Sequence, residues 1–140
     1  MVRHHGAGLA ATQVGSLLAM FAYREHPEDD AQVLVNPRVV WASAERRAFV
    51  EGCLSFNTVL VEVERPAAVA VAGQNPHGDG IRIEAEGYLA SLLQHEIDHL
   101  NGVLTLDRAT AAERRRVVAA LSGQQRHQNL TASETPIRPI

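Results

Sequence analysis

The sequence has one cysteine, no lysine and no long apolar run. The single cysteine, Cys53, has no partner for an internal disulfide, and a lone thiol is typical of a reducing compartment or of a cysteine kept for its chemistry. Because no run of about 18 apolar residues occurs, a membrane-spanning helix is excluded. The first residues also lack the apolar core of a signal peptide, so we expect a cytoplasmic protein with no membrane partner.

The composition is that of an ordinary globular domain. Of the 140 residues, 46% are hydrophobic and 21% are charged. The 13 basic residues, all arginine, face 16 acidic ones, and the net charge of −3 gives no overall positive field that would attract nucleic acid. We expect one domain over residues 1–123. Residues 124–140 are polar, contain Pro136 and Pro139 and lack periodicity, which predicts a loosely ordered tail.

Short runs of alternating apolar and polar residues predict β-strands in the N-terminal part of the chain. Strands are expected over residues 47–56, 59–63, 67–72 and 81–86. The run 32–41 is expected as two short strands broken at Asn36–Pro37. Because short turns link these runs, the sheet should be antiparallel.

After residue 86 the apolar spacing changes to three and four, which predicts a helix over residues 87–101. Leu89, Leu93 and Ile97 mark its core-facing stripe, and the pair Asn101–Gly102 is a typical stop.

A second helix is expected over residues 111–122. Thr110 and Glu113 form a capping box at its start, and Gly123 is expected to end it. The fold class is therefore α+β: short antiparallel strands packed around a central helix that carries an HExxH motif, with a helix at the C-terminus.

The HExxH motif, residues 95–99, lies within the first helix. His95 and His99 are four residues apart, so both imidazoles leave the same helix face and can bind one metal ion. They continue a stripe with Tyr88 and Leu92, which places them on the inward side. Glu96 is rotated by about 100° and suits a general base that acts on water at the metal.

Two histidines do not complete a metal site, and a third ligand is needed. Thr105 stands where one protease class has a third histidine, and Glu113 is better used in its capping box. Cys53 is the remaining option, although a lone cysteine is more commonly a small buried apolar side chain.

The segment 6–15 is rich in glycine and alanine, and such small residues let a backbone approach a ligand closely. Gln13 within it carries a neutral amide that could donate a hydrogen bond to a developing oxyanion.

Three segments taken together resemble the signature motifs of the peptide deformylases. They read GAGLAATQVG, EGCLS and QHEIDHLNGVL, and the resemblance runs from Gly6 to Asp107. The chain resembles an N-terminally short variant, because members usually carry a few tens of residues before the first motif. The resemblance implies removal of the formyl group from N-formylmethionyl peptides or nascent chains.

The resemblance also implies the cofactor and the roles of the site residues. One divalent ion, Fe²⁺ first and Zn²⁺, Ni²⁺ or Co²⁺ as substitutes, would be bound by Cys53, His95 and His99. Water held at its open position would attack the formyl carbonyl, with Glu96 as general base. The remaining implied site residues are Gln13 and the Leu54 backbone N–H for the oxyanion, Gly6, Gly8 and Gly52 for the substrate backbone, and Tyr88 and Leu92 for the methionine side chain.

Some positions depart from the family pattern or have a less specific role. The rim of the site is altered at Asn57, where the second motif usually ends in proline, and at Leu60, within a stretch that lacks the usual basic residue. That basic residue helps to hold the substrate backbone in the family, and Arg65 is the first one available here. Gln94 and Asp98 are expected behind the site or at the surface. The run Arg114–Arg116 is expected as a solvated helix face, with contact to the ribosome through the C-terminal helix as the alternative.

Three rival functions stay open on the sequence. The first is a peptide-binding protein of the same family that has lost turnover. The second is a general HExxH metallopeptidase, which would cleave internal peptide bonds and would not need Cys53. The third is a closed structural metal site, for which the sequence offers no convincing fourth ligand.

Overall fold

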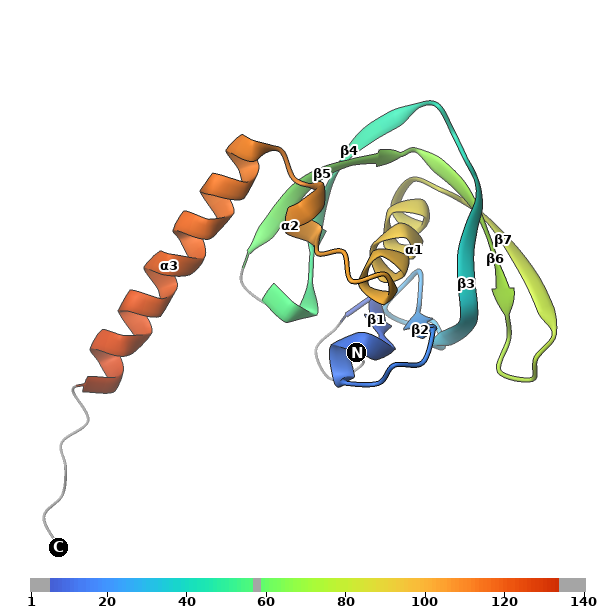
Figure 1. Cartoon of the computed structure of the whole chain (residues 1–140), viewed down its shortest axis with the longest axis horizontal. Helices are drawn as coiled ribbons and strands as arrows, with labels where there is room; N and C mark the ends of the chain where they lie inside the picture. The colour runs from blue at the N-terminus through green and yellow to red at the C-terminus, as the bar shows by residue number, and fades with distance from the viewer. Residues whose placement is uncertain (1–5, 57–58, 134–140) are drawn as a thin grey trace, which may run out of the picture.

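Two antiparallel sheets enclose one central helix. The computed structural model describes residues 6–56 and 59–133, the last ten of these as backbone only. One sheet has five strands in the order β1-β2-β3-β6-β7, and the other has two, β4 and β5. The central helix, α1 (Gly87–Leu100), lies between them (Figure 1). The α+β class and the antiparallel pairing are thereby confirmed.

The N-terminal part of the large sheet contains two strands that the sequence did not predict. They are β1 (Gly8–Ala10) and β2 (Met20–Tyr23), which pair with each other, and β2 pairs in turn with β3 (Gln32–Ala42). The expectation of two short strands in 32–41 is wrong, because β3 is continuous. Asn36 adopts a left-handed φ of 50°, and the register with β6 shifts beside it. Asn36–Pro37 is therefore an irregularity within one strand.

The remaining strands follow the alternating runs of the sequence. They are β4 (Arg46–Gly52), β5 (Leu60–Pro66), β6 (Ala68–Gln74) and β7 (Gly80–Glu86). The predicted strand 47–56 ends early, because β4 stops at Gly52 and a short 3₁₀ turn, η3 (Leu54–Phe56), follows Cys53. Cys53 therefore lies just beyond the end of β4, with its side chain next to His99 of α1.

Helix α1 is buried on every side rather than along one stripe. All residues from Ala90 to His99 are buried, including six polar ones. Leu93 and Ile97 belong to a core cluster with Phe21, Leu34 and Val71 of the large sheet. A helix covered by a sheet on each side loses contact with water all round, so each of its polar side chains needs a partner inside the protein.

The predicted stop of α1 is confirmed. Asn101 caps the helix, its amide side chain donates to the carbonyl of Ile97, and Gly102 follows with a left-handed φ of 72°. A glycine adopts this conformation without the cost that a side chain would add.

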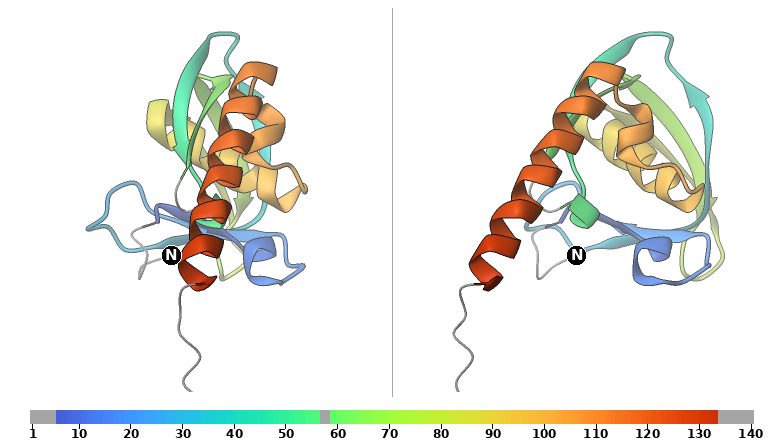
Figure 2. Two further views of the ribbon diagram at one scale, coloured as in Figure 1. Left: turned by 90° about the vertical axis from the view of Figure 1, so that its left-hand side faces the viewer. Right: turned by 60° about the vertical axis from the view of Figure 1, so that its left-hand side comes forward.

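The C-terminal part forms α2 (Thr105–Arg108) and α3 (Ala111–Ser133). Val117 of α3 is fully buried against Val59, Val61 and Val63, which anchors the start of α3 to β5, while its far end projects from the body (Figure 2). The expected end at Gly123 is wrong: the helix runs ten residues further, to Ser133. None of the helices in the described residues combines the length and hydropathy that a membrane crossing requires.

Two physical reasons account for the longer helix. Gly123 is absent from the residues with positive φ, so it lies within the helix at a cost of about 1 kcal/mol relative to alanine instead of capping it. The glutamines that follow it favour helix. Of the expected tail, residues 134–140 lie outside the described residues, and the division at residue 123 stays a prediction.

The capping box at the start of α3 is only half formed. The N–H of Glu113 donates to Oγ1 of Thr110, as expected, at 3.1 Å. The Glu113 carboxylate does not return to the cap. It accepts the N–H of Glu62 on β5 and pairs with Arg116, which ties α3 to the two-stranded sheet.

Candidate metal centre and its cleft

Three possible ligand atoms converge where the end of β4 meets α1. The Sγ atom of Cys53 lies 3.3 Å from Nε2 of His99, which lies 3.0 Å from Nε2 of His95. Among the described residues, these three form the group whose donor atoms all lie within 4.8 Å of one another. All three side chains are buried. The predicted trio is therefore brought together, and Thr105 and Glu113 are not part of it.

The electrostatics of this group favour a thiolate. Burial opposes ionisation of the Cys53 thiol, but the hydrogen bonds to His95 and His99 outweigh it and lower the pKa of Cys53 to about 5. Burial likewise opposes a charge on His95, and its bonds to Cys53 and Glu51 outweigh that and raise its pKa to about 9. A thiolate is the form of cysteine that binds metals.

Glu96 lies beside the trio and is nearly inaccessible, with 2% of its surface exposed. Its Oε2 atom has no hydrogen-bond partner among the described residues. Burial is the main cause that raises the pKa of this carboxyl to about 7. The residue across from it is Gly8 of β1, where a Cβ atom would overlap the carboxylate. Such a carboxyl can take up and release a proton near neutral pH.

A buried acid that the sequence analysis left without a role supports His95 from behind. Glu51, the second-last residue of β4, has an Oε2 atom 2.9 Å from Nδ1 of His95. Its other oxygen accepts bonds from Ser91 on α1 and from Arg65 on β5. These bonds and the charge of Arg65 overcome the effect of burial and lower the pKa of Glu51 to about 2. The carboxylate thereby fixes the orientation of the imidazole.

Arg65 and Asp98 extend this network to the C-terminal segment. Arg65 is 3% exposed and donates to Asp98 as well as to Glu51, so it cannot hold a substrate backbone as the sequence suggested. Asp98 also pairs with Arg108 of α2 at 2.6 Å. Gln94 is buried too and donates to backbone carbonyls. Neither Asp98 nor Gln94 is a surface residue.

A signal for this network was present in the sequence. The alternation of β5 places Val61, Val63 and Arg65 on its buried face. A buried arginine requires an acidic partner, and in the paired strand the acid at an inward position is Glu51.

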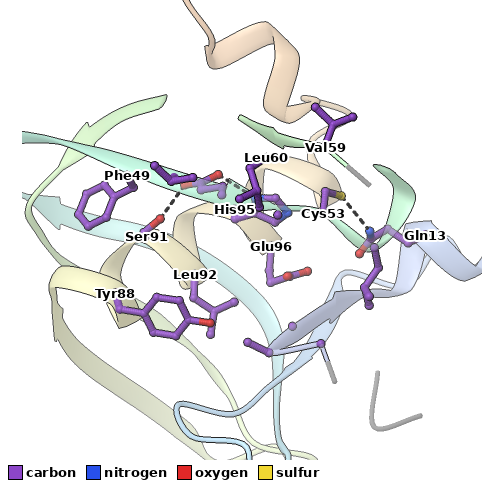
Figure 3. Close-up of a pocket in the computed structure, with 17 residues that line it drawn as sticks. Gln13, Phe49, Cys53, Val59, Leu60, Tyr88, Ser91, Leu92, His95 and Glu96 are labelled. Atoms are coloured by element: carbon purple, nitrogen blue, oxygen red, sulfur yellow. Dashed lines mark hydrogen bonds and ion pairs between the residues drawn. The ribbon is translucent and has the colours of Figure 1, made fainter. Parts of the chain in front are cut away.

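Gln13 lies on the far side of Cys53 from Ser91 (Figure 3). Gln13 belongs to the 3₁₀ turn η2 (Ala11–Val14), which follows β1 directly. Its Oε1 atom accepts the N–H of Ala10, which leaves the Nε2 amide to point at the Sγ of Cys53, 3.6 Å away, and at Ser55. Leu54 lines the same cleft. Figure 3 shows Gln13 directed toward Cys53.

The cleft has a volume of about 500 Å³, and all site residues predicted from the sequence line it except His99. Tyr88 and Leu92 form one side, beside Glu96 (Figure 3). The lining residues to which the sequence assigned no role are Ala7, Phe49, Val50, Glu51, Val59 and Ser91. Leu60, one of the two altered rim positions, lines the cleft as well, and the other, Asn57, lies outside the described residues. These lining residues come mainly from the β4–β5 ribbon, whose position over α1 is a long-range property of the fold.

Comparison with known proteins identifies the family. The family model for polypeptide deformylase matches residues 1–115, which is most of the chain. The chain belongs to the peptide deformylase family. Members of this family are metal-dependent hydrolases, and Cys53, His95 and His99 form the candidate metal site of this one.

Relatives in the family agree with this placement. The peptide deformylase of Rhizobium meliloti (strain 1021) is 47% identical over 116 residues, which cover 81% of this chain and 67% of the relative. That of Thermotoga neapolitana is 43% identical over 114 residues, covering 81% and 68%. The crystal structure of a peptide deformylase from Legionella pneumophila superposes with a TM-score of 0.83 at 34% identity, covering 97% of this chain and 78% of that one.

Proposed function

We propose that this chain is a metal-dependent deformylase that hydrolyses the formyl group from N-formylmethionyl peptides. The observation that carries the proposal is the convergence of Cys53, His95 and His99, because Cys53 and His95 line the same cleft as Glu96. One carboxylate oxygen of Glu96 is buried there with no partner among the described residues. Family membership supports the same reaction.

The donor set fits one divalent cation. One thiolate and two imidazoles are ligands suited to Fe²⁺, Zn²⁺, Ni²⁺ and Co²⁺, and three protein ligands leave a position open. We assign Fe²⁺ first, with the other three as substitutes. When bound, the ion supplies a Lewis acid that polarises the formyl carbonyl and acidifies water.

Glu96 moves the proton. Its carboxylate takes a proton from the attacking water while the water oxygen bonds to the formyl carbon. The C–N bond then breaks, and the proton passes from Glu96 to the departing amine, so formate and a free methionyl amine are the products. The unpaired Oε2 atom and the pKa of about 7 suit both transfers.

Two donors would stabilise the negative charge that develops on the carbonyl oxygen. They are the Nε2 amide of Gln13 and the backbone N–H of Leu54. The bond from the Ala10 N–H to Oε1 keeps the Gln13 amide oriented with its N–H groups toward Cys53. Removal of one such donor typically costs about 2.7–4 kcal/mol of transition-state stabilisation.

The rest of the cleft would hold the peptide. Tyr88 and Leu92 offer apolar surface next to Glu96, which suits the methionine side chain. Gly8 begins β1, Gly6 precedes it, and both line the cleft, where an extended peptide could pair with the backbone. Gly52, the last residue of β4, lines the same cleft.

A nascent chain in the cytoplasm is the natural source of such a peptide, and we propose this setting. Ribosome contact through α3 is a separate proposal. In the run Arg114–Arg116, the Arg114 side chain donates to the carbonyl of Leu106, and Arg116 pairs with Glu113. These internal bonds leave Arg115 as the main candidate for a contact with RNA.

Release of formate from a formylmethionyl tripeptide tests the proposal. The protein is purified without oxygen and loaded with Fe²⁺ or Ni²⁺, because a thiolate site is prone to oxidation. We expect formate from the parent and almost none from Glu96→Ala. A folded, metal-loaded parent that releases no formate would favour a binding protein without turnover. Cleavage at internal peptide bonds would favour a general metallopeptidase.

A further inference from the structure

A second hollow adjoins the cleft, and three apolar residues line both spaces: Val50, Val59 and Leu60. The second hollow has a volume of about 490 Å³ and lies between β5 and α3. Val59 is buried, whereas 65% of the Val50 surface and 59% of the Leu60 surface are exposed, so these two side chains form the ridge between the hollows. Exposed apolar groups placed together beside a binding cleft are typical of a contact surface for a ligand.

The strand register explains why these side chains stand together. Gly52 lies opposite Leu60, and Val50 lies opposite Glu62, so Val50 and Leu60 are diagonal neighbours on one face of the β4–β5 ribbon. Gly52 has no side chain to cover Leu60. In Figure 3, Leu60 lies on the side of the pocket opposite Tyr88.

The charges around the ridge oppose an acidic ligand. No arginine or lysine lines the first cleft within the described residues, whereas Glu51 and Glu96 do. Arg116 is the cation of the second hollow. It is held by Glu113 at 2.6 Å and by the carbonyl of Leu60 at 2.7 Å. Among the residues that the structure describes, an acidic side chain at the ridge would therefore meet no free positive charge, and Glu62 would repel it.

Resting on the deformylase activity proposed above, we propose that Val50 and Leu60 are specificity-determining residues. They select formylmethionyl peptides that carry an apolar side chain at one of the two residues after methionine, and they disfavour peptides with acidic side chains there. An extended peptide advances about 3.3 Å per residue. The two substrate residues after methionine therefore lie within reach of Val50 and Leu60, which line the same cleft. Apolar contact discriminates between side chains by about tenfold or more.

The test compares kcat/KM for three peptides on the metal-loaded parent: formyl-Met-Leu-Leu, formyl-Met-Ala-Ala and formyl-Met-Asp-Asp. We expect the leucine peptide to exceed the alanine peptide by about tenfold, mostly through KM, and the aspartate peptide to be the poorest. Leu60→Ser should bring the leucine-to-alanine ratio close to one. Leu18→Ser is the matched control, because Leu18 is 63% exposed and lines neither hollow, and it should keep the parent ratio.

Leu60→Lys provides a second variant that does not depend on the stability of the serine form. It places a cation on the ridge, so the aspartate peptide should gain on the alanine peptide. Equal kcat/KM for all three peptides with the parent, or an unchanged leucine-to-alanine ratio in Leu60→Ser, would overturn the proposed role of Val50 and Leu60. The deformylase activity itself would not be affected by either result. If no peptide yields formate, the proposed function fails and this inference fails with it.

Discussion

Oε2 of Glu51 lies 2.9 Å from Nδ1 of His95, so the carboxylate of one strand orients the imidazole of the central helix. That imidazole presents its other nitrogen to His99, 3.0 Å away. Arg65 in turn holds Glu51 with two bonds. The elements β4, β5 and α1 thus hold the donor set in place before a metal binds. Groups that hydrogen-bond to a metal ligand fix the orientation of that ligand.

Glu51→Gln should weaken the site without removing a ligand. The amide cannot balance the charge of Arg65, which is 3% exposed, and it holds His95 less strongly. We expect a 10- to 100-fold weaker affinity for Zn²⁺ in a competition titration with a chelator, to the order of magnitude typical of such supports. The free energy of unfolding should fall by about 3 kcal/mol, because a buried pair loses one charge.

Glu64→Gln is the matched control for this substitution. Glu64 lies on the same ribbon, but 72% of its side chain is exposed. An exposed ion pair contributes about 0–1 kcal/mol, so both the Zn²⁺ affinity and the stability should stay close to those of the parent. Equal losses in the two variants would show that the effect is not specific to the support of His95.

Cys53→Ser should abolish metal retention while the fold persists. The serine hydroxyl is a poor ligand for a soft or borderline cation, and Cys53 lies 3.3 Å from His99 at the centre of the donor set. Elemental analysis after anaerobic purification should give close to one metal ion per chain for the parent and almost none for the variant. Glu96→Ala, which lies outside the donor set, should keep its metal. Full metal content in Cys53→Ser would favour a general HExxH peptidase.

Gly8→Ala should reduce turnover by displacing Glu96. An added Cβ overlaps the Glu96 carboxylate, which is buried and has little room to move. We expect lower kcat for formate release and a loss of about 1–3 kcal/mol in stability, as for other over-packed cores. Gly80→Ala is the control, since a Cβ there meets nothing within 4 Å. Unchanged kcat in Gly8→Ala would mean that the carboxylate moves without consequence.

The sequence predicted the elements whose pattern is local. The stripe of Leu89, Leu93 and Ile97 identified α1, and the pair Asn101–Gly102 identified its end. It did not predict β1, because a strand of three residues is too short to show an alternation that could distinguish it from a loop. It also ended α3 too early, because a glycine can be accommodated within a helix at a modest cost.

The residues of the candidate site likewise include some that a local pattern predicts and others that only the fold brings together. His95 and His99 follow from their spacing on one helix, whereas the inclusion of Cys53 rested on a resemblance. The contact of Glu51 with His95 spans 44 positions in the chain, and that of Gly8 with Glu96 spans still more. No local pattern specifies such contacts. They require knowledge of how β1 and the β4–β5 ribbon lie on α1.

The contact between α3 and β5 depends on pH through the carboxyl group of Glu113. The bonds from Arg116 and from the N–H of Glu62 lower the pKa of Glu113 to about 2, from an ordinary value of 4.5. A carboxyl whose pKa is lower in the folded chain stabilises it fully above the unfolded value, and this contribution is lost as the pH falls from 4.5 toward 2.

Glu113→Gln removes this contribution, so the parent should have the higher Tm near neutral pH, and the difference should shrink steadily below about pH 4.5. Thermal unfolding of both proteins from pH 6 to pH 3 measures it, and the other titrating groups are common to both. In an Arg116→Gln background, the same substitution should change Tm much less, because Glu113 has lost its charged partner. A difference in Tm that is constant over this pH range would mean that α3 is held to β5 by apolar packing around Val117 alone.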